Sequence, residues 1–209
     1  MSSRPTIRPY RLDDRAAVYD VCVRTAHEGG DARHIYPDQD LMPNVYAGPY
    51  LHLEPDLAFV LDNGERAVGY ILGTADTEAF VAAYRADWLP RLETRYPRPA
   101  GTPRTPTENI VDLMHRPERM VLRELAAYPA HLHIDLLPPY QRQGHGRALM
   151  RTFLSALRHR GVPAVHLGLA TANTAARAFY DRLGFHEIPV AGSGPSVTYL
   201  GRATSGPYP

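Results

Sequence analysis

The fold of this chain is decided by the stretch Leu136-Leu137-Pro138-Pro139-Tyr140-Gln141-Arg142-Gln143-Gly144-His145-Gly146-Arg147-Ala148-Leu149-Met150. It places a two-glycine turn between a predicted strand, His131–Leu137, and a predicted helix, Gly146–Arg160. Glycine lets the backbone of such a turn come close to a bulky anion, and the amides and dipole at a helix start favour negative charge. Arg142 and Arg147 flank the turn and can screen that charge. A plain tight turn makes the same demands, so the surrounding pattern decides whether this is an anion site.

The elements on either side predict an α/β layer. Downstream, a strand is expected over Ala164–Ala170, a helix over Asn173–Leu183, and strands over Phe185–Val190 and Val197–Leu200. Upstream we expect a strand at Ile7–Tyr10, a helix through residues 12–25, and a hairpin of Leu57–Leu61 and Ala67–Thr74. The alternation of strands and helices in the second half favours a sheet with parallel neighbours at its centre.

Three segments are less regular. His27–Pro55 lacks a clear period and is predicted as a long irregular stretch, the kind that often carries function. Thr77–Leu92 has helical periodicity, and residues 97–106 read as an exposed proline-rich loop. Glu108–Tyr128 is predicted as two short helices interrupted at Pro117.

The composition describes an ordinary globular protein of 209 residues, with 44% hydrophobic and 22% charged side chains. A net charge of +1 gives no general attraction to nucleic acid or acidic membranes. The single cysteine, Cys22, allows no internal disulfide, and its place in an apolar helix stripe favours packing over a nucleophilic role. We found no long apolar run and no signal-peptide core in residues 1–11, so a cytoplasmic protein is expected, as a monomer or a homodimer.

The glycine turn resembles a known signature. Gln141-x-x-Gly144-x-Gly146 is similar to the Gln/Arg-x-x-Gly-x-Gly/Ala motif of the GCN5-related N-acetyltransferases (GNAT), whose loop holds the pyrophosphate of acetyl-coenzyme A. The spacing is neither that of a Rossmann fingerprint nor that of a P-loop. Asn173, the pair Phe179-Tyr180 and Leu183-Gly184-Phe185 follow in the family's order. The resemblance implies the GNAT fold, a mixed twisted sheet of about six to seven strands flanked by helices, with acetyl-coenzyme A as cosubstrate and no metal.

The resemblance also implies roles for individual residues. The backbone of Leu136 and Leu137 would pair with the pantetheine arm like an added strand, and the Asn173 side chain would bond the same arm. Tyr180 would return a proton to the leaving thiolate as general acid, although it can also be a core aromatic of its helix. The cofactor-binding set is then Leu136, Leu137, Gln141, Arg142, Gln143, Gly144, His145, Gly146, Arg147, Asn173 and Tyr180.

The attacking amine needs a base, and one strand offers candidates. His131, His133 and Asp135 project to one face of the strand because side chains alternate. Their placement resembles the paired histidines of arylalkylamine N-acetyltransferases, and we expect His133 or Asp135 to act as base. In the alternative, His131 lies in solvent at the strand mouth and Asp135 is a structural carboxylate. A metal site of the His-x-His type lacks a third ligand that the sequence can place.

A second resemblance covers nearly the whole chain. Tyr36-Pro37-Asp38-Gln39-Asp40, Gly48-Pro49-Tyr50-Leu51, Trp88-Leu89-Pro90 and Ile134-Asp135-Leu136-Leu137-Pro138 are similar to the C-terminal acetyltransferase-like domain of eukaryotic protein O-GlcNAcase. That domain lacks the glycine pattern in its loop, whereas this chain keeps it. We therefore expect a free-standing relative that can bind the cofactor, a single domain over residues 1–209 with a helical and loop insertion at 93–129.

The acceptor side is expected in the irregular stretch. In GNAT folds the loop after the first helix lines that side, so His34, Tyr36, Asp38 and Asp40 are candidates for binding the substrate. Their carboxylates would suit a cationic amine. Alternatively, the loop packs down and its acids cap helices.

Three functions remain open from the sequence. The first is an N-acetyltransferase acting on a primary amine, either a small molecule or a protein lysine or N-terminus, by direct attack in a ternary complex. The second is a catalytically silent sensor or interaction module that binds acetyl-coenzyme A. The third is a thiol hydrolase using Cys22, against which the absence of an adjacent Cys-His motif argues.

Overall fold

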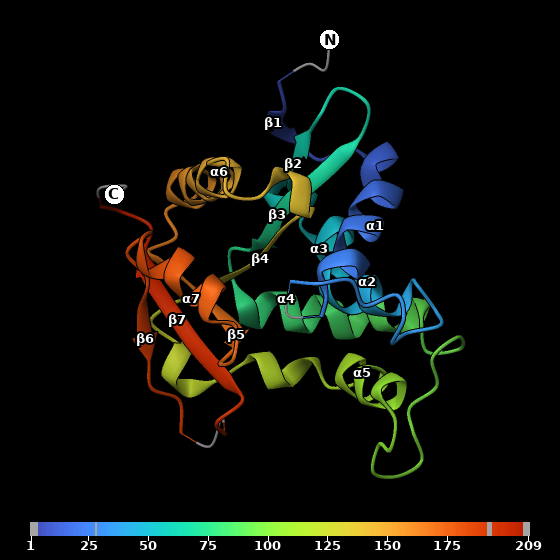
Figure 1. Cartoon of the computed structure of the whole chain (residues 1–209). Helices are drawn as coiled ribbons and strands as arrows, with labels where there is room; N and C mark the ends of the chain where they lie inside the picture. The colour runs from blue at the N-terminus through green and yellow to red at the C-terminus, as the bar shows by residue number, and fades with distance from the viewer. Residues whose placement is uncertain (1–3, 28, 192–193, 207–209) are drawn as a thin grey trace.

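The computed structural model describes residues 4–27, 29–191 and 194–206. Within these ranges, a sheet of seven strands runs in the order β1-β2-β3-β4-β5-β7-β6. All its neighbouring strands are antiparallel except β4 and β5, which are parallel. The predicted mixed sheet and its parallel centre are both confirmed (Figure 1).

The first half of the sheet is a meander that matches the prediction closely. It comprises β1 (Thr6–Pro9), β2 (Phe59–Asp62) and β3 (Ala67–Thr74). Every residue of β3 is buried, as expected for a strand covered on both faces. Helix α1 (Arg15–Thr25) packs on β3 and β4, whereas α6 (His145–His159) packs on β2, β3 and β4 from the other side (Figure 1).

The prediction of an irregular stretch over His27–Pro55 is wrong in part, because two helices form there. They are α2 (Leu41–Tyr46) and α3 (Gly48–Leu53), each six residues long. Such short helices hold too few turns to show a period, and packing rather than propensity stabilises them. Gly48 lets them approach their neighbours closely: a Cβ there would lie 2.7 Å from the Trp88 ring.

The helical segments after β3 follow the prediction. They begin with α4 (Thr77–Ala83), a π-helical turn η3 (Tyr84–Trp88) and η4 (Leu89–Arg91). After the proline-rich loop come α5 (Pro106–Met114), η5 (Pro117–Met120) and η6 (Arg123–Leu125). The break at Pro117 is confirmed, although the part beyond it forms 3₁₀ turns instead of a second α-helix. This segment runs along one edge of the molecule, from the α2 side towards β6 and β7 (Figure 1).

The second half contains the elements around the glycine turn. They are β4 (Ala130–Leu136), η7 (Pro138–Tyr140), α6, β5 (Ala164–Ala170), α7 (Thr174–Asp181), β6 (His186–Ile188) and β7 (Val197–Ala203). Each predicted strand and helix of this half is present; β5 has the predicted bounds, and the ends of the other elements differ by no more than three residues. Cys22 is buried at 3% exposure, as its place in the apolar stripe predicted.

The parallel pair at the centre opens like a V. Strands β4 and β5 pair only at Ala130 with Val165 and at His131 with His166. From Leu132 onward the edge of β4 that faces β5 has no strand partner in the described structure, while β3 pairs with its other edge up to Leu136. Strand β5 is held by β7 along its whole length, so the two halves of the sheet diverge. The candidate functional site lies in and around this opening.

No helix in the described ranges has the length and apolar character that crossing a membrane requires.

Candidate functional site

The glycine turn adopts a strained backbone. Gly144, the residue before α6, has φ 85°. Arg142 has φ 59°, and among the described residues it is the one non-glycine residue with positive φ. A left-handed conformation costs an L-residue about 1–2 kcal/mol, and such strain concentrates at functional sites. Successive amides in a turn of this kind form a concave nest that binds anions.

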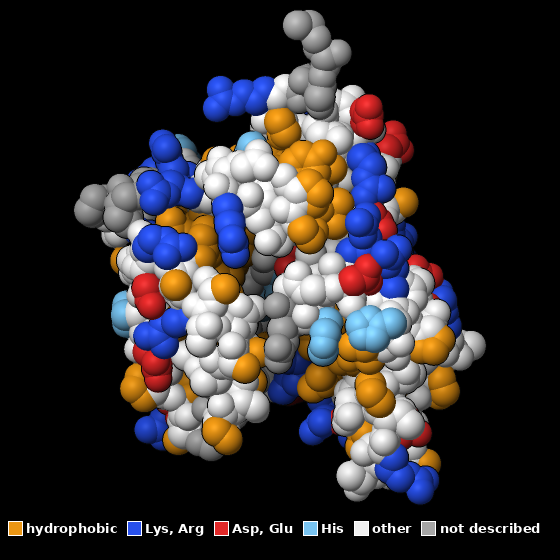
Figure 2. Space-filling model, in the orientation of Figure 1, with side chains coloured by type: hydrophobic (Ala, Val, Ile, Leu, Met, Phe, Trp, Pro, Cys, Tyr) orange, Lys and Arg blue, Asp and Glu red, His pale blue; other side chains and the backbone are white. Residues whose placement is uncertain are grey.

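The amides of this turn have no protein acceptor. None of the backbone N–H groups from Arg142 to Arg147 donates to a described residue, and the first bond of α6 runs from Ala148 to the Gly144 carbonyl. Helix starts leave amides unpaired, but six in a row extend well into the preceding loop. A diphosphate is an anion with enough acceptor oxygens to use them. Arginine side chains gather over α6 on the same surface (Figure 2).

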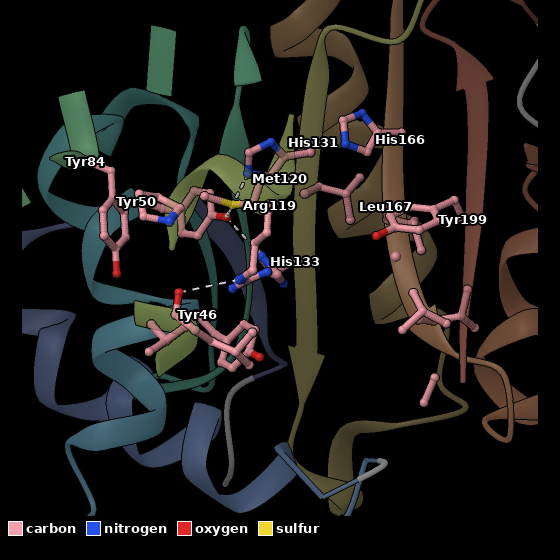
Figure 3. Close-up of a pocket in the computed structure, with 18 residues that line it drawn as sticks. Tyr46, Tyr50, Tyr84, Arg119, Met120, His131, His133, His166, Leu167 and Tyr199 are labelled. Atoms are coloured by element: carbon pink, nitrogen blue, oxygen red, sulfur yellow. Dashed lines mark hydrogen bonds between the residues drawn. The ribbon is translucent and has the colours of Figure 1, made fainter. Parts of the chain in front are cut away.

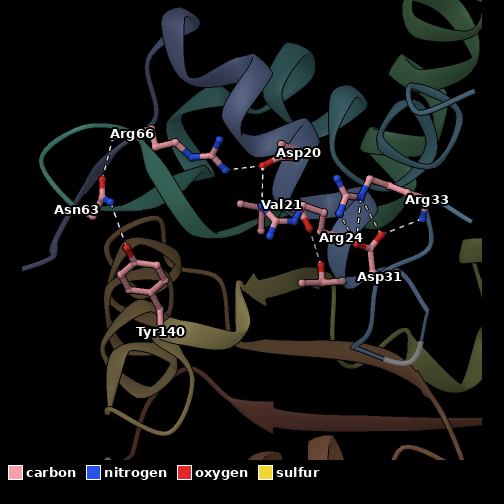
Figure 4. Close-up of polar contacts among 9 residues, drawn as sticks. Asp20, Val21, Arg24, Asp31, Arg33, Asn63, Arg66 and Tyr140 are labelled. Atoms are coloured by element: carbon pink, nitrogen blue, oxygen red, sulfur yellow. Dashed lines mark hydrogen bonds and ion pairs between the residues drawn. The ribbon is translucent and has the colours of Figure 1, made fainter.

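Side chains brace the turn from beneath instead of filling it. Gln141 Nε2 donates to the Leu136 carbonyl at 2.8 Å, and Gln143 Nε2 donates to the Pro139 carbonyl at 2.6 Å. Asn63, from the β2–β3 turn, donates to the Tyr140 hydroxyl at 3.1 Å and ties the loop to the hairpin (Figure 4). The two glutamines, predicted to bind the cofactor, therefore hold the shape of the loop.

The two glycines serve different purposes. A Cβ on Gly144 would meet nothing within 4 Å, so its glycine is needed for the left-handed backbone. A Cβ on Gly146 would lie 3.2 Å from the Phe179 ring and 3.6 Å from Leu136. Gly146 thus lets α7 pack against the start of α6.

The open edge of β4 includes Leu136 but not Leu137. The Leu137 amide donates to the Val68 carbonyl at 3.0 Å, and its carbonyl accepts from Tyr140. Leu137 is thus bonded on its β3 side and its carbonyl already accepts one bond, and its predicted role in binding the cofactor stays a prediction. Successive residues point to alternate sides, so the amides of Leu136 and Ile134 face the opening. The Leu136 amide has no acceptor among the described residues.

Tyr180 lies on α7, and Asn173 is the residue that caps the start of this helix. The Asn173 side-chain oxygen caps α7 by accepting from the Ala176 amide at 3.0 Å, which leaves its NH₂ group for another acceptor. Tyr180 is 8% exposed and packs edge-on against Phe179 and Phe185. Its hydroxyl has no hydrogen-bond partner among the described residues. Burial, with the nearby Asp135 carboxylate, raises the pKa of Tyr180 well above its usual value, so the hydroxyl keeps its proton.

The histidines of β4 form a hydrogen-bonded chain (Figure 3). Thr77 Oγ1 lies 2.8 Å from the Pro129 carbonyl and 2.8 Å from His131 Nδ1. Tyr50 Oη lies 2.7 Å from His131 Nε2 and 3.0 Å from His133 Nε2. His131 is 5% exposed with both ring nitrogens bonded, so the alternative that it lies in solvent is wrong.

These hydrogen bonds determine which ring nitrogen of His131 and of His133 carries the proton. The Pro129 carbonyl can only accept, so the single Thr77 proton goes to it and His131 must donate from Nδ1. His131 Nε2 then accepts from Tyr50, and the Tyr50 oxygen accepts from His133 Nε2–H. Neutral His133 consequently carries its lone pair on Nδ1. Burial, together with the charge of Arg119, lowers the pKa of His133 to about 4, so the ring is neutral at physiological pH.

Asp135 lies further along the same face of β4, under α1. Its Oδ2 accepts from the Tyr70 hydroxyl at 2.6 Å. Burial raises the pKa of Asp135 to about 7, although hydrogen bonds from Tyr70 and Thr25 oppose the shift. It does not line the pocket described next. No group of three or more His, Cys, Asp or Glu side chains in the described ranges is arranged to hold a metal ion.

A pocket of about 250 Å³ occupies the opening between β4 and β5 (Figure 3). The surface is hollowed between the β5–β7 side and the α2–α5 side of the molecule (Figure 2). The polar side chains that line the pocket are Tyr46, Tyr50, Tyr84, Arg119, His131, His133, His166 and Tyr199. Sequence reasoning missed all of these except the two histidines of β4, because they come from segments far apart in the chain. Tyr50 fell within a quoted motif, but nothing in the motif gave it a role.

The predicted acceptor residues lie elsewhere. Asp38 and Asp40 both form ion pairs with Arg95, at 2.9 and 3.0 Å, and Asp38 also accepts from the Tyr96 hydroxyl. Neither they nor His34 and Tyr36 line the pocket. The two carboxylates thus hold the loop through Arg95 and Tyr96, and Asp40 makes no side-chain bond that caps α2, contrary to the capping role that the alternative expected. A role of the four residues in acceptor binding stays a prediction.

Comparisons with known proteins agree with this geometry. The model of the Acetyltransferase (GNAT) family matches residues 115–185. Protein O-GlcNAcase of Rattus norvegicus is 29% identical over 201 residues, which is 95% of this chain; the chain spans only 22% of that protein's length. [Ribosomal protein bS18]-alanine N-acetyltransferase of Escherichia coli K12 is 45% identical over 53 residues, covering 25% of this chain and 36% of that protein.

Among solved structures, the crystal structure of a protein called SsHAT is 64% identical and superposes with a TM-score of 0.93. The match covers 97% of this chain and 99% of that one. The glycine turn at the start of α6 and the divergence of β4 from β5 agree with these matches. The chain belongs to the acetyltransferase (GNAT) family and is related to the acetyltransferase-like region of O-GlcNAcase.

Proposed function

We propose that this chain is an N-acetyltransferase that moves the acetyl group of acetyl-coenzyme A to a primary amine by direct attack in a ternary complex. The observation that carries the proposal is the run of unpaired amides from Arg142 to Arg147 next to an unpaired edge of β4. The amides suit a diphosphate, and the edge suits an extended chain that bears amide groups. Coenzyme A has both parts in series.

The residues present fit that ligand. Gly144 and Arg142 shape the nest for the diphosphate, and the Leu136 amide and the Asn173 NH₂ group can bond the pantetheine arm. We take residues 1–209 as one such domain, in which the segment 93–129 supplies a wall of the pocket through Leu113, Pro117, Arg119 and Met120.

In the proposed reaction, the chain's own groups move two protons. His133 accepts a proton from the attacking amine at Nδ1, while the nitrogen–carbon bond forms at the acetyl carbonyl. Tyr180 donates its hydroxyl proton to the sulfur as the carbon–sulfur bond breaks, and solvent restores that proton. The products are an N-acetylated amine and free coenzyme A. Asp135 is the alternative base, supported by its pKa of about 7.

The Tyr50 bridge supports His133 in this role. The bridge holds the lone pair on Nδ1, and the Tyr50 oxygen can stabilise the imidazolium that forms after proton transfer. With a pKa of about 4, His133 is a weak base. It would therefore pass the proton taken from the amine on to solvent soon after receiving it.

The test separates an enzyme from a silent sensor. Calorimetry should show binding of acetyl-coenzyme A, and a thiol-release assay over a panel of primary amines should show amine-dependent turnover. The chain contains no lysine, so every acetyl-lysine found after incubation with a protein acceptor belongs to that acceptor. Binding without turnover above the hydrolysis blank would favour the sensor, and a lack of binding would defeat both functions.

A further inference from the structure

The pocket between β4 and β5 is positively charged, whereas the sequence predicted carboxylates on the acceptor side. None of the described residues that line it is an aspartate or a glutamate, and Arg119 is the one residue there that is charged at neutral pH. The histidines are neutral because burial, the largest cause, lowers their pKa values. The carboxylates once expected to receive a cationic amine are bonded to Arg95, outside the pocket. An acceptor whose only charge is positive would therefore be repelled by Arg119 and would find no carboxylate in the pocket lining.

Arg119 has no acidic partner among the described residues. Its Nε makes one long contact, 3.5 Å, to the Leu113 carbonyl. The nearby acids are taken by other arginines: Glu118 pairs with Arg85 at 2.6 Å, and Asp112 pairs with Arg116. The guanidinium lies on the pocket wall, where it can receive a carboxylate in two parallel hydrogen bonds.

A second donor points to the same conclusion. Tyr84 is 2% exposed, and its hydroxyl is a buried side-chain atom with no hydrogen-bond partner in the described structure. Buried polar atoms without a partner are rare in native proteins and call for an explanation. Tyr84 lines the pocket on the same side of β4 as Arg119, within a π-helical turn, a distortion frequent at functional sites (Figure 3). A ligand that supplies an acceptor oxygen would satisfy it.

We propose that the acceptor is a small amine that also carries a carboxylate, a free amino acid by chemical class. Its carboxylate binds Arg119 and the Tyr84 hydroxyl, and its amine lies at His133. The carbon skeleton packs on the apolar lining formed by Val45, Leu113, Met120, Leu169 and Val197. This inference rests on the proposed function. The amine nitrogen forms the new amide bond, and the carboxylate is unchanged by the reaction.

The size of the site favours a small molecule over a protein. About 250 Å³ lies just below the range of about 300–1,000 Å³ that is usual for ligand pockets. The N-terminal residue of a protein has no free α-carboxylate, since that carboxyl is in a peptide bond.

The test uses matched pairs that differ only in the carboxylate. L-Phenylalanine is compared with 2-phenylethylamine, and L-leucine with 3-methylbutylamine, in the thiol-release assay. We expect kcat/KM to be at least about tenfold higher for the member with the carboxylate, the range of one charge-assisted contact. Arg119→Gln should abolish this preference through KM, Arg119→Lys should restore part of it, and Tyr84→Phe should weaken it. Arg123→Gln, which changes an exposed arginine outside the pocket, should leave the preference intact.

Two further measurements separate this inference from the proposed function. Calorimetry with 3-phenylpropanoate, which lacks the amine, should show binding to the wild type and none to Arg119→Gln, whether or not turnover occurs. The pKa of His133, followed by NMR, should rise in Arg119→Gln because a positive charge near it has gone. Three results would each overturn the inference. The wild type could turn over amines without preferring those with a carboxylate, or Arg119→Gln could keep the preference. Alternatively, a peptide N-terminus could be acetylated faster than free amino acids. If the wild type binds 3-phenylpropanoate but acetylates no amine, that result would count against the proposed function and not against the carboxylate site.

Discussion

The two sides of the V-shaped opening are built in different ways. The side on which we place the cofactor is built mainly from one continuous segment, residues 136–147, which contributes backbone amides, with Asn173 and Tyr180 added from the α7 region. The acceptor side consists of side chains from α2, α3, η3, α5, η5, β4, β5 and β7, and its polar groups are aromatic or imidazole rings and one guanidinium. A backbone site depends on local turn chemistry, whereas a side-chain site depends on how distant elements pack. The first can be recognised in a sequence, and the second only in a fold.

The largest effect is expected from the group that joins the two sides, Tyr180. General acid catalysis contributes about 10²–10⁴-fold to rates, so Tyr180→Phe should lower kcat by about a hundredfold or more. The affinity for acetyl-coenzyme A should change little, because the ring and its contacts with Phe179 and Phe185 remain. Steady-state kinetics and calorimetry on the same variant provide the comparison. Equal losses of turnover and affinity would show that Tyr180 is a packing residue.

A smaller effect is expected at Gly144, on the cofactor side alone. At φ 85° a valine is strained by at least about 1–2 kcal/mol, so Gly144→Val should weaken coenzyme A binding by about tenfold or more. Gly161, with φ 71° and nothing within 4 Å of its Cβ position, gives a matched control at the far end of α6.

Gly161→Val should lower the thermal midpoint while leaving the affinity unchanged. If both valine variants bind coenzyme A like the wild type, the turn is not the diphosphate site.

The pH dependence distinguishes the two candidate bases. A base works when deprotonated, so the rate rises with pH through its pKa. With His133 as base and its pKa at about 4, kcat should stay flat between pH 5.5 and 8. If kcat instead rises with pH around pH 7, and this rise disappears in Asp135→Asn, the base is Asp135, whose pKa is about 7. Insensitivity of the profile to substitution of both residues would remove the base from β4.

The smallest effect concerns stability in acid. The folded pKa of His133 lies below its unfolded value of about 6.5, so the folded state binds fewer protons. Its contribution is fully present above pH 6.5 and is lost as the pH falls towards 4. The free energy of unfolding of the wild type should therefore fall between pH 7 and pH 5 by about 2 kcal/mol more than that of His133→Gln. An identical pH dependence in the two proteins would show that folding does not lower the pKa of His133.

The contrast between the two sides also explains what sequence alone could predict. The strands and helices from β4 to β7 could be predicted because glycine turns and apolar periods are local signals, and Gly144 belongs to such a turn. Asn173 and Tyr180 were singled out through the resemblance to the GNAT signature, and their roles stay predictions. Helices α2 and α3 were missed because six-residue helices containing Pro43 and Pro49 carry no period. The bonding of Asp38 to Arg95 joins residues 57 positions apart, and no local pattern reveals it. The Tyr50 bridge and the unpartnered Tyr84 hydroxyl likewise depend on tertiary packing.

Hydrogen exchange on the backbone amides tests the central claim most directly. Amides from Arg142 to Arg147, together with that of Leu136, have no protein acceptor and should exchange quickly in the unliganded protein. Addition of coenzyme A should slow exchange at these positions, while the amide of Leu137, already bonded to Val68, should change little. Bound coenzyme A without protection at the turn, or protection confined to other parts of the chain, would contradict the account.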